Sequence, residues 1–90
     1  MATVHLLIKG KVQGVFFRAT AKEIAESLGI TGWIKNTEEG YVESIAIGTE
    51  EKVQKFIEWC KQGPSGARVM DIVVSYTEDQ HLSSFKIIRE

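Results

Sequence analysis

The sequence predicts an α+β fold in which two helices cover one face of a mainly antiparallel sheet. Alternating apolar residues indicate strands, two amphipathic stretches indicate helices, and these elements follow one another in the order βαββαβ. The chain has 90 residues and no Pro-, Gly- or Ser-rich tract divides it, so we expect a single domain over residues 1–90. With 43% hydrophobic and 26% charged residues, the composition is that of a folded globular protein.

The first strand and the first helix follow from two different periodicities. Val4, Leu6 and Ile8 alternate with their neighbours, which predicts a strand over residues 3–10. Gly29 then stands where a left-handed C-terminal helix cap belongs. The helix before it is predicted from apolar residues at helical spacing: Phe17, Ala21, Ile24, Ala25 and Leu28.

A hairpin and a second helix come next. Residues 30–37 and 41–48 read as two strands joined by a tight turn over residues 38–40. Thr49 is a suitable helix N-cap, and Glu50 and Glu51 are favourably placed against the helix dipole. Gly63 and Pro64 end this helix. Its buried stripe is expected to consist of Val53, Phe56, Ile57 and Cys60.

The last strands complete a ferredoxin-like sandwich. Residues 69–76 are rich in β-branched side chains and predict a fourth strand, and residues 85–88 predict a short fifth. A crossover through the first helix leaves the first two strands parallel, and the split arrangement puts the third strand between them. Their C-terminal ends then share one edge, with axes about 10 Å apart. The segments that follow these two ends should therefore face a common gap.

The segment after the first strand, GKVQGVFFR at residues 10–18, is suited to binding an anion. Backbone amides in such a strand-to-helix turn, with the positive end of the helix dipole, can surround phosphate oxygens. Arg18 adds a planar guanidinium suited to bidentate phosphate contact. The same residues also fit ordinary turn geometry and a solvated helix arginine, and the spacing of a P-loop is absent.

Asn36 lies at the end of the second strand, opposite the anion segment. Its carboxamide can hold a water and touch a phosphoryl oxygen without carrying a charge. Asparagine before a turn also satisfies local backbone groups, which is the plainer interpretation of an isolated Asn.

Charge and composition argue against several classes of function. Eleven basic and twelve acidic side chains give a net charge of −1, which gives no support for nucleic-acid or membrane-surface binding, and exposed aromatic pairs of the RNA-binding kind are not evident. No apolar run is long enough for a spanning helix. His5, His81 and Cys60 form no metal-ligand pattern, so we expect no cofactor and no metal. Cys60 reads as a core residue, His5 has no evident acid or base partner, and a single cysteine suggests the cytoplasm.

Two segments of the chain resemble the signatures of the acylphosphatase family: GKVQGVFFR at residues 10–18 and GWIKNTEEGYVESIAIG at residues 32–48. The likeness extends through GPSGARV at residues 63–69 to FKI at residues 85–87. The resemblance implies that Arg18 and the backbone amides of the first motif bind a phosphoryl group, and that Asn36 positions the attacking water. The amides in question are those of Gln13, Gly14, Val15, Phe16, Phe17 and Arg18.

The chemistry that this resemblance implies is metal-independent hydrolysis of small acyl phosphates to carboxylate and inorganic phosphate. The carboxylate is already a good leaving group, so positioning and charge neutralisation should suffice. We expect inorganic phosphate or another anion to occupy the site, and the protein to be a monomer. The competing hypothesis is a catalytically silent anion-binding or interaction module on the same fold, since a fold does not determine a function.

Overall fold

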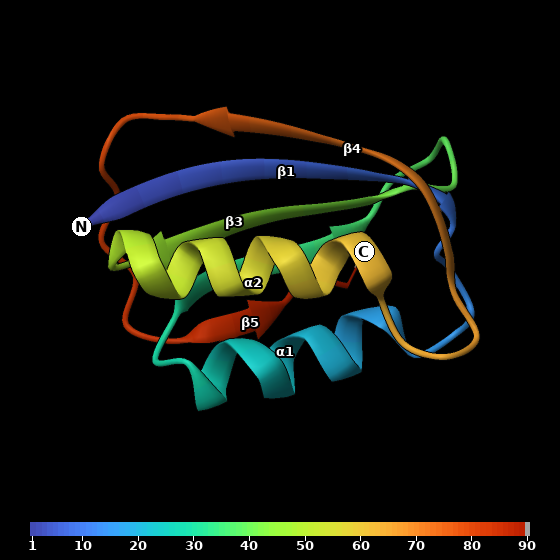
Figure 1. Ribbon diagram of the computed structural model, residues 1–90, viewed down its shortest axis with the longest axis horizontal. Helices are drawn as coiled ribbons and strands as arrows, with labels where there is room; N and C mark the ends of the chain where they lie inside the picture. The colour runs from blue at the N-terminus through green and yellow to red at the C-terminus, as the bar shows by residue number, and fades with distance from the viewer. Residues whose placement is uncertain (90) are drawn as a thin grey trace.

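The computed structural model describes residues 1–89, which form a five-stranded sheet with two helices packed against one face (Figure 1). The predicted order and the short fifth strand are confirmed, and the predicted strand ends differ from the observed ones by at most one residue. The elements are β1 (Ala2–Lys11), α1 (Phe17–Ser27), β2 (Thr31–Asn36), β3 (Val42–Gly48), α2 (Glu50–Gln62), β4 (Arg68–Tyr76) and β5 (Phe85–Ile87).

The strand order across the sheet is β4-β1-β3-β2-β5. β3 pairs antiparallel with both β1 and β2, so the predicted parallel course of β1 and β2 with β3 between them is confirmed. β5 pairs parallel with β2, with Gly32 opposite Phe85 and Ile34 opposite Ile87. The sequence did not indicate which edge the short strand would join. Its position makes the C-terminal end of β5 a neighbour of the C-terminal end of β2.

The core lies between the sheet and the helices. Val4, Leu6 and Ile8 are fully buried on the covered face of β1, as their alternation predicts. Burying a side chain of this size contributes roughly 1.5–3 kcal/mol. The rings of Phe17 and Trp59 meet edge to face with centroids 5.4 Å apart, which joins α1 to α2. The predicted stripe of α2 is buried throughout: Val53, Phe56, Ile57 and Cys60.

A bulge at the end of β1 turns the chain out of the sheet toward α1. The pairing of β1 with β4 shifts register between Lys9 and Gly10, and Gly10 has φ 129°. A Cβ at this position would lie 2.2 Å from the carbonyl oxygen of Arg68, so the close approach of the two backbones requires glycine. The bulge thereby aims the loop of residues 12–16 at the N-terminus of α1.

Within residues 1–89, neither helix has the length and apolarity that a crossing of the membrane would need.

Candidate active site

The loop of residues 12–16 presents unpaired backbone amides. Gly14 has φ 73°, and Phe16 has φ 63° and ψ 23°, so both adopt left-handed backbone conformations. In the part of the chain that the structure describes, the amides of residues 13–16 donate no backbone hydrogen bond. The amides of Phe17 and Arg18 lie in the first helical turn, where no intrahelical acceptor exists. These donors are therefore available to a bound anion.

The two helices differ at their N-termini. In α2, the Thr49 hydroxyl accepts a hydrogen bond from the Lys52 amide at 3.3 Å, and Glu50 and Glu51 occupy the first turn. In α1, the N-cap residue Phe16 makes no side-chain cap and the first turn contains no acidic residue. The positive end of the α1 dipole is thus left without a negative partner from its own first turn, which favours an anion there.

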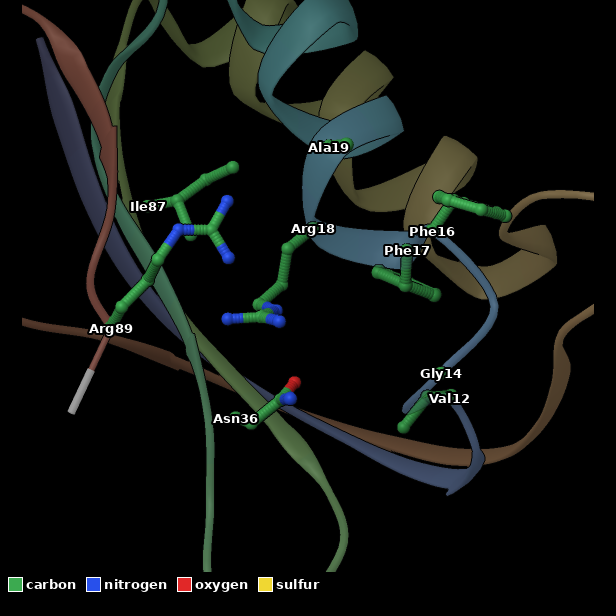
Figure 2. A pocket seen from close by; sticks show the side chains of 9 residues that line it. All are labelled: Val12, Gly14, Phe16, Phe17, Arg18, Ala19, Asn36, Ile87 and Arg89. Carbon is green, nitrogen blue, oxygen red and sulfur yellow. The ribbon is translucent and has the colours of Figure 1, made fainter.

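Arg18 and Asn36 approach each other from different elements. Arg18 is the second residue of α1, and Asn36 is the last residue of β2, on the face that the helices cover. Figure 2 shows the guanidinium and the carboxamide directed toward one another across a cavity of about 350 Å³. The cavity is lined by Val12, Gly14, Phe16, Phe17, Arg18, Ala19, Asn36, Ile87 and Arg89.

Most of the residues predicted for the site line this one cavity, namely Gly14, Phe16, Phe17, Arg18 and Asn36. Gln13 and Val15 belong to the same loop but are not among the lining residues. Phe17 is buried in the core, whereas the Phe16 side chain is 82% exposed. Arg18 and Asn36, which lie at opposite ends of the segment formed by α1 and β2, therefore meet as the parallel course of β1 and β2 predicts.

The Asn36 carboxamide has an unused acceptor. Among the described residues, its Oδ1 is buried and has no hydrogen-bond partner. An unsatisfied buried polar atom typically costs about 1–3 kcal/mol. Because Asn36 lines the cavity, a water or a ligand held there can supply the missing donor. Rotation about χ2 would present the amide nitrogen in place of the oxygen, so the side chain can accept or donate at this point.

The Gln13 side chain connects the anion loop to the hairpin that carries Asn36. Its Nε2 donates to the carbonyl oxygens of Thr37 and Tyr41, at 2.9 Å each. Sequence reasoning considered Gln13 only for its backbone amide and missed this role. The acceptors lie 24 and 28 residues away, so no local pattern indicates them.

Arg89 was also missed by sequence reasoning. The Ile88 amide donates to the Ile34 carbonyl at 2.9 Å, which extends the pairing of β5 with β2 by one residue. Arg89 follows and lines the cavity with Arg18 (Figure 2). Because the sequence did not place β5 beside β2, it could not bring Arg89 to the same edge.

The other titratable residues singled out in the sequence lie away from the cavity. A partner of His5 was not evident from the sequence, and in the structure its Nε2 lies 2.7 Å from Glu43 Oε2 on the uncovered face of the sheet. Cys60 is buried as predicted, and burial raises the pKa of its thiol well above the ordinary value. Across residues 1–89, no three His, Cys, Asp or Glu side chains form a group that could hold a metal ion.

Comparison with known proteins agrees with these features. The family model described as Acylphosphatase matches residues 4–87. An acylphosphatase of Pyrobaculum aerophilum is 46% identical over 90 residues, covering 98% of this chain and 95% of that protein. Among solved structures, an acylphosphatase from Bacillus subtilis superposes with a TM-score of 0.95 at 33% identity, covering 99% of this chain and all of the other. One from Coxiella burnetii has a TM-score of 0.93 at 36% identity, with 97% and 92% coverage.

The family model covers residues 4–87, and the sequence similarity to the Pyrobaculum aerophilum protein extends over nearly the whole of both chains. Both findings agree with the resemblance carried by the two sequence motifs. The chain belongs to the acylphosphatase family.

Proposed function

We propose that this acylphosphatase hydrolyses the carboxyl–phosphate bond of small acyl phosphates by in-line attack of a water that Asn36 positions. Arg18 and the backbone amides of residues 13–18 hold the phosphoryl group. The observation that carries the proposal is the single cavity shared by Arg18, Asn36 and the loop before α1. The products are a carboxylate and inorganic phosphate.

Binding rests on charge and on donors that are already in place. The loop amides and the open N-terminus of α1 provide donors for the phosphoryl oxygens, and Arg18 supplies a full positive charge beside them. As negative charge spreads over the three equatorial oxygens in the transition state, donors held in this way stabilise it without reorganising. The Gln13 side chain holds the loop against the hairpin and so fixes the position of these donors relative to Asn36.

The attack uses the free acceptor of Asn36. A water that donates one hydrogen to Asn36 Oδ1 is held with a lone pair available for phosphorus. The leaving carboxylate needs no general acid, so the reaction can proceed without a metal. Among the described residues that line the cavity there is no His, Asp or Glu, and we therefore assign the proton of the attacking water to an oxygen of the substrate phosphate. A pH profile of turnover that required a protein base would overturn that assignment.

The test is benzoyl phosphate hydrolysis with a chelator present. Asn36→Ala should lose about two to three orders of magnitude in kcat, the usual cost of removing one preorganised group from a transition state. Arg18→Ala should lose both turnover and substrate binding, because the guanidinium contacts the phosphoryl group in both states. Glu38→Gln, in the exposed turn after Asn36, is the matched control and should behave as wild type.

Binding is measured separately by thermal stabilisation with inorganic phosphate. A ligand that binds only the folded state at ten times its Kd stabilises by about 1.4 kcal/mol. We expect inorganic phosphate to raise the Tm of wild type and of Asn36→Ala, and the phosphate affinities of these two proteins to agree within several-fold. The Tm of Arg18→Ala should not rise with phosphate. Full activity in Asn36→Ala would remove Asn36 from the mechanism.

The same assay separates catalysis from the silent anion-binding module. Phosphate stabilisation without hydrolysis of benzoyl phosphate would support that module. We further propose that the protein acts as a monomer in the cytoplasm, because one chain supplies every element of the site and Cys60 is a buried free thiol.

A further inference from the structure

The cavity contains a second guanidinium that the proposed mechanism does not use. Phe85, Ile87 and Arg89 alternate along β5 and its extension, and Phe85 is buried against α2, with ring centroids of Phe85 and Phe56 5.7 Å apart. Alternation therefore directs Arg89 to the same side of the sheet. Figure 2 shows its guanidinium beside Ile87, with Arg18 lying between Arg89 and the loop at Gly14.

Arg89 is not neutralised within the protein as described. Among residues 1–89, no acidic side chain forms an ion pair or hydrogen bond with Arg89, and no Asp or Glu lines the cavity. Two like charges that line one cavity repel each other unless an anion accompanies them. Arg18 lies between the loop and Arg89, so a phosphoryl group bound at the loop contacts Arg18 first. Arg89 is then available to a second negative group.

The dimensions of the site agree with a ligand larger than phosphate. A cavity of about 350 Å³ lies in the range of sites for small organic molecules, roughly 300–1,000 Å³. With the phosphoryl group at the loop, the lining residues left to contact the acyl group include Ile87 and Arg89. Ile87 is a partly buried apolar residue, suited to the carbon skeleton. The Arg89 guanidinium lies beside Ile87, so a charged end of an acyl group packed on Ile87 would lie close to it.

We propose that Arg89 binds a carboxylate on the acyl group, so that the preferred substrates are acyl phosphates of dicarboxylic acids. This inference rests on the proposed function. A guanidinium can bind a carboxylate through two parallel hydrogen bonds. A neutral acyl group would leave the Arg89 guanidinium without an anionic partner. The reaction itself is unchanged: water attacks phosphorus, the bond between phosphorus and the acyl oxygen breaks, and the dicarboxylate leaves with that electron pair.

The test compares substrates of the same shape that differ in one charge. 4-Carboxybenzoyl phosphate and 4-methylbenzoyl phosphate form the pair, and the rigid ring keeps the free carboxylate from attacking its own acyl carbon. 3-Carboxybenzoyl phosphate places the charge at a second position. The readout is the ratio of kcat/KM for the charged and the uncharged substrate. Comparing this ratio between proteins cancels the difference in intrinsic reactivity.

Arg89→Gln should lower the charged-to-uncharged ratio about ten-fold for at least one isomer, since charge-assisted hydrogen bonds are the strong ones. Arg89→Lys should have a ratio between those of wild type and Arg89→Gln, because lysine keeps the positive charge but cannot form two parallel hydrogen bonds to a carboxylate. In wild type the ratio should fall as ionic strength rises, and less so in Arg89→Gln. Lys86→Gln removes the same charge from β5 at an exposed position outside the cavity, and its ratio should match wild type.

Three outcomes would overturn the inference. An unchanged ratio in Arg89→Gln for both isomers would mean that Arg89 binds no acyl carboxylate. An equal loss with 4-methylbenzoyl phosphate, accompanied by weaker inhibition by inorganic phosphate, would assign Arg89 to the phosphoryl group instead. If wild type hydrolysed none of the three substrates, the proposed function would fail together with this inference, whereas the first two outcomes leave the proposed function intact.

Discussion

Phe16 has a left-handed backbone conformation, which is unusual for a residue other than glycine. It adopts φ 63° with an 82% exposed side chain, so burial of the ring does not compensate the left-handed conformation. Left-handed backbone costs a residue with a Cβ roughly 1–2 kcal/mol. The amide and the hydroxyl of Thr20 both donate to the Phe16 carbonyl, at 3.1 and 2.9 Å. These bonds hold the turn that exposes the loop amides to the cavity.

Substitutions at Phe16 should separate backbone strain from side-chain contact. Asparagine tolerates left-handed backbone and valine does not, so Phe16→Asn should be at least as stable as wild type. Phe16→Val should be less stable than wild type and bind inorganic phosphate more weakly, because branching at Cβ makes the left-handed conformation still less favourable than it is for Phe. Urea unfolding and phosphate titration provide both quantities. Equal stability of the two variants would show that strain at Phe16 is unimportant.

At the scale of elements, Tyr76 joins the outer strand β4 to the first turn of α2. The Tyr76 hydroxyl donates to Glu50 Oε1 and accepts from Gln54 Nε2 at 2.8 Å. Gln54 Nε2 also donates to Glu50 Oε1 at 3.2 Å. The hydrogen bonds from Tyr76 and Gln54 lower the pKa of Glu50, and the bond to Glu50 raises the pKa of Tyr76. This small network lies at the surface, where salt and solvent weaken it.

The opposite pKa shifts define a pH window for the network. The stabilisation from Glu50 is present above its ordinary pKa of 4.5 and is lost as pH falls through the lowered value. The stabilisation from Tyr76 is present below its ordinary pKa of 10.0 and is lost as pH rises through its raised pKa. Tyr76→Phe should therefore reduce stability at neutral pH, and the difference from wild type should shrink in acid and in alkali. Denaturant midpoints across the pH range measure it, and a constant difference would contradict this account.

At the scale of the whole molecule, β4 is an edge strand with exposed apolar side chains, among them Met70, Val73 and Val74. Such an edge invites pairing with a second chain. Here Asp71 Oδ1 accepts the Ile72 amide at 2.9 Å, so one backbone donor of this strand is already occupied and a negative charge stands beside it. Charged side chains on an edge strand are a common protection against self-association.

The protein should therefore sediment as a monomer over a wide concentration range, and Asp71→Ala should shift it toward dimers or larger species. Asp79→Ala, which removes the same charge from the exposed segment after β4, should leave the monomer unchanged. Sedimentation velocity of the three proteins provides the comparison. A wild-type dimer would refute the monomer proposal, and a monomeric Asp71→Ala would leave that side chain without a protective role.

The amino-acid sequence by itself determined the element order, the buried faces of β1 and α2, and the meeting of Arg18 with Asn36. These depend on local periodicity and on the handedness of one crossover, which are properties of neighbouring residues. Only the tertiary structure decided the partners of Gln13 and His5, the parallel pairing of β5 with β2, and hence the presence of Arg89 in the cavity. Each of these is a contact between residues far apart in the chain, and packing rather than local preference selects it.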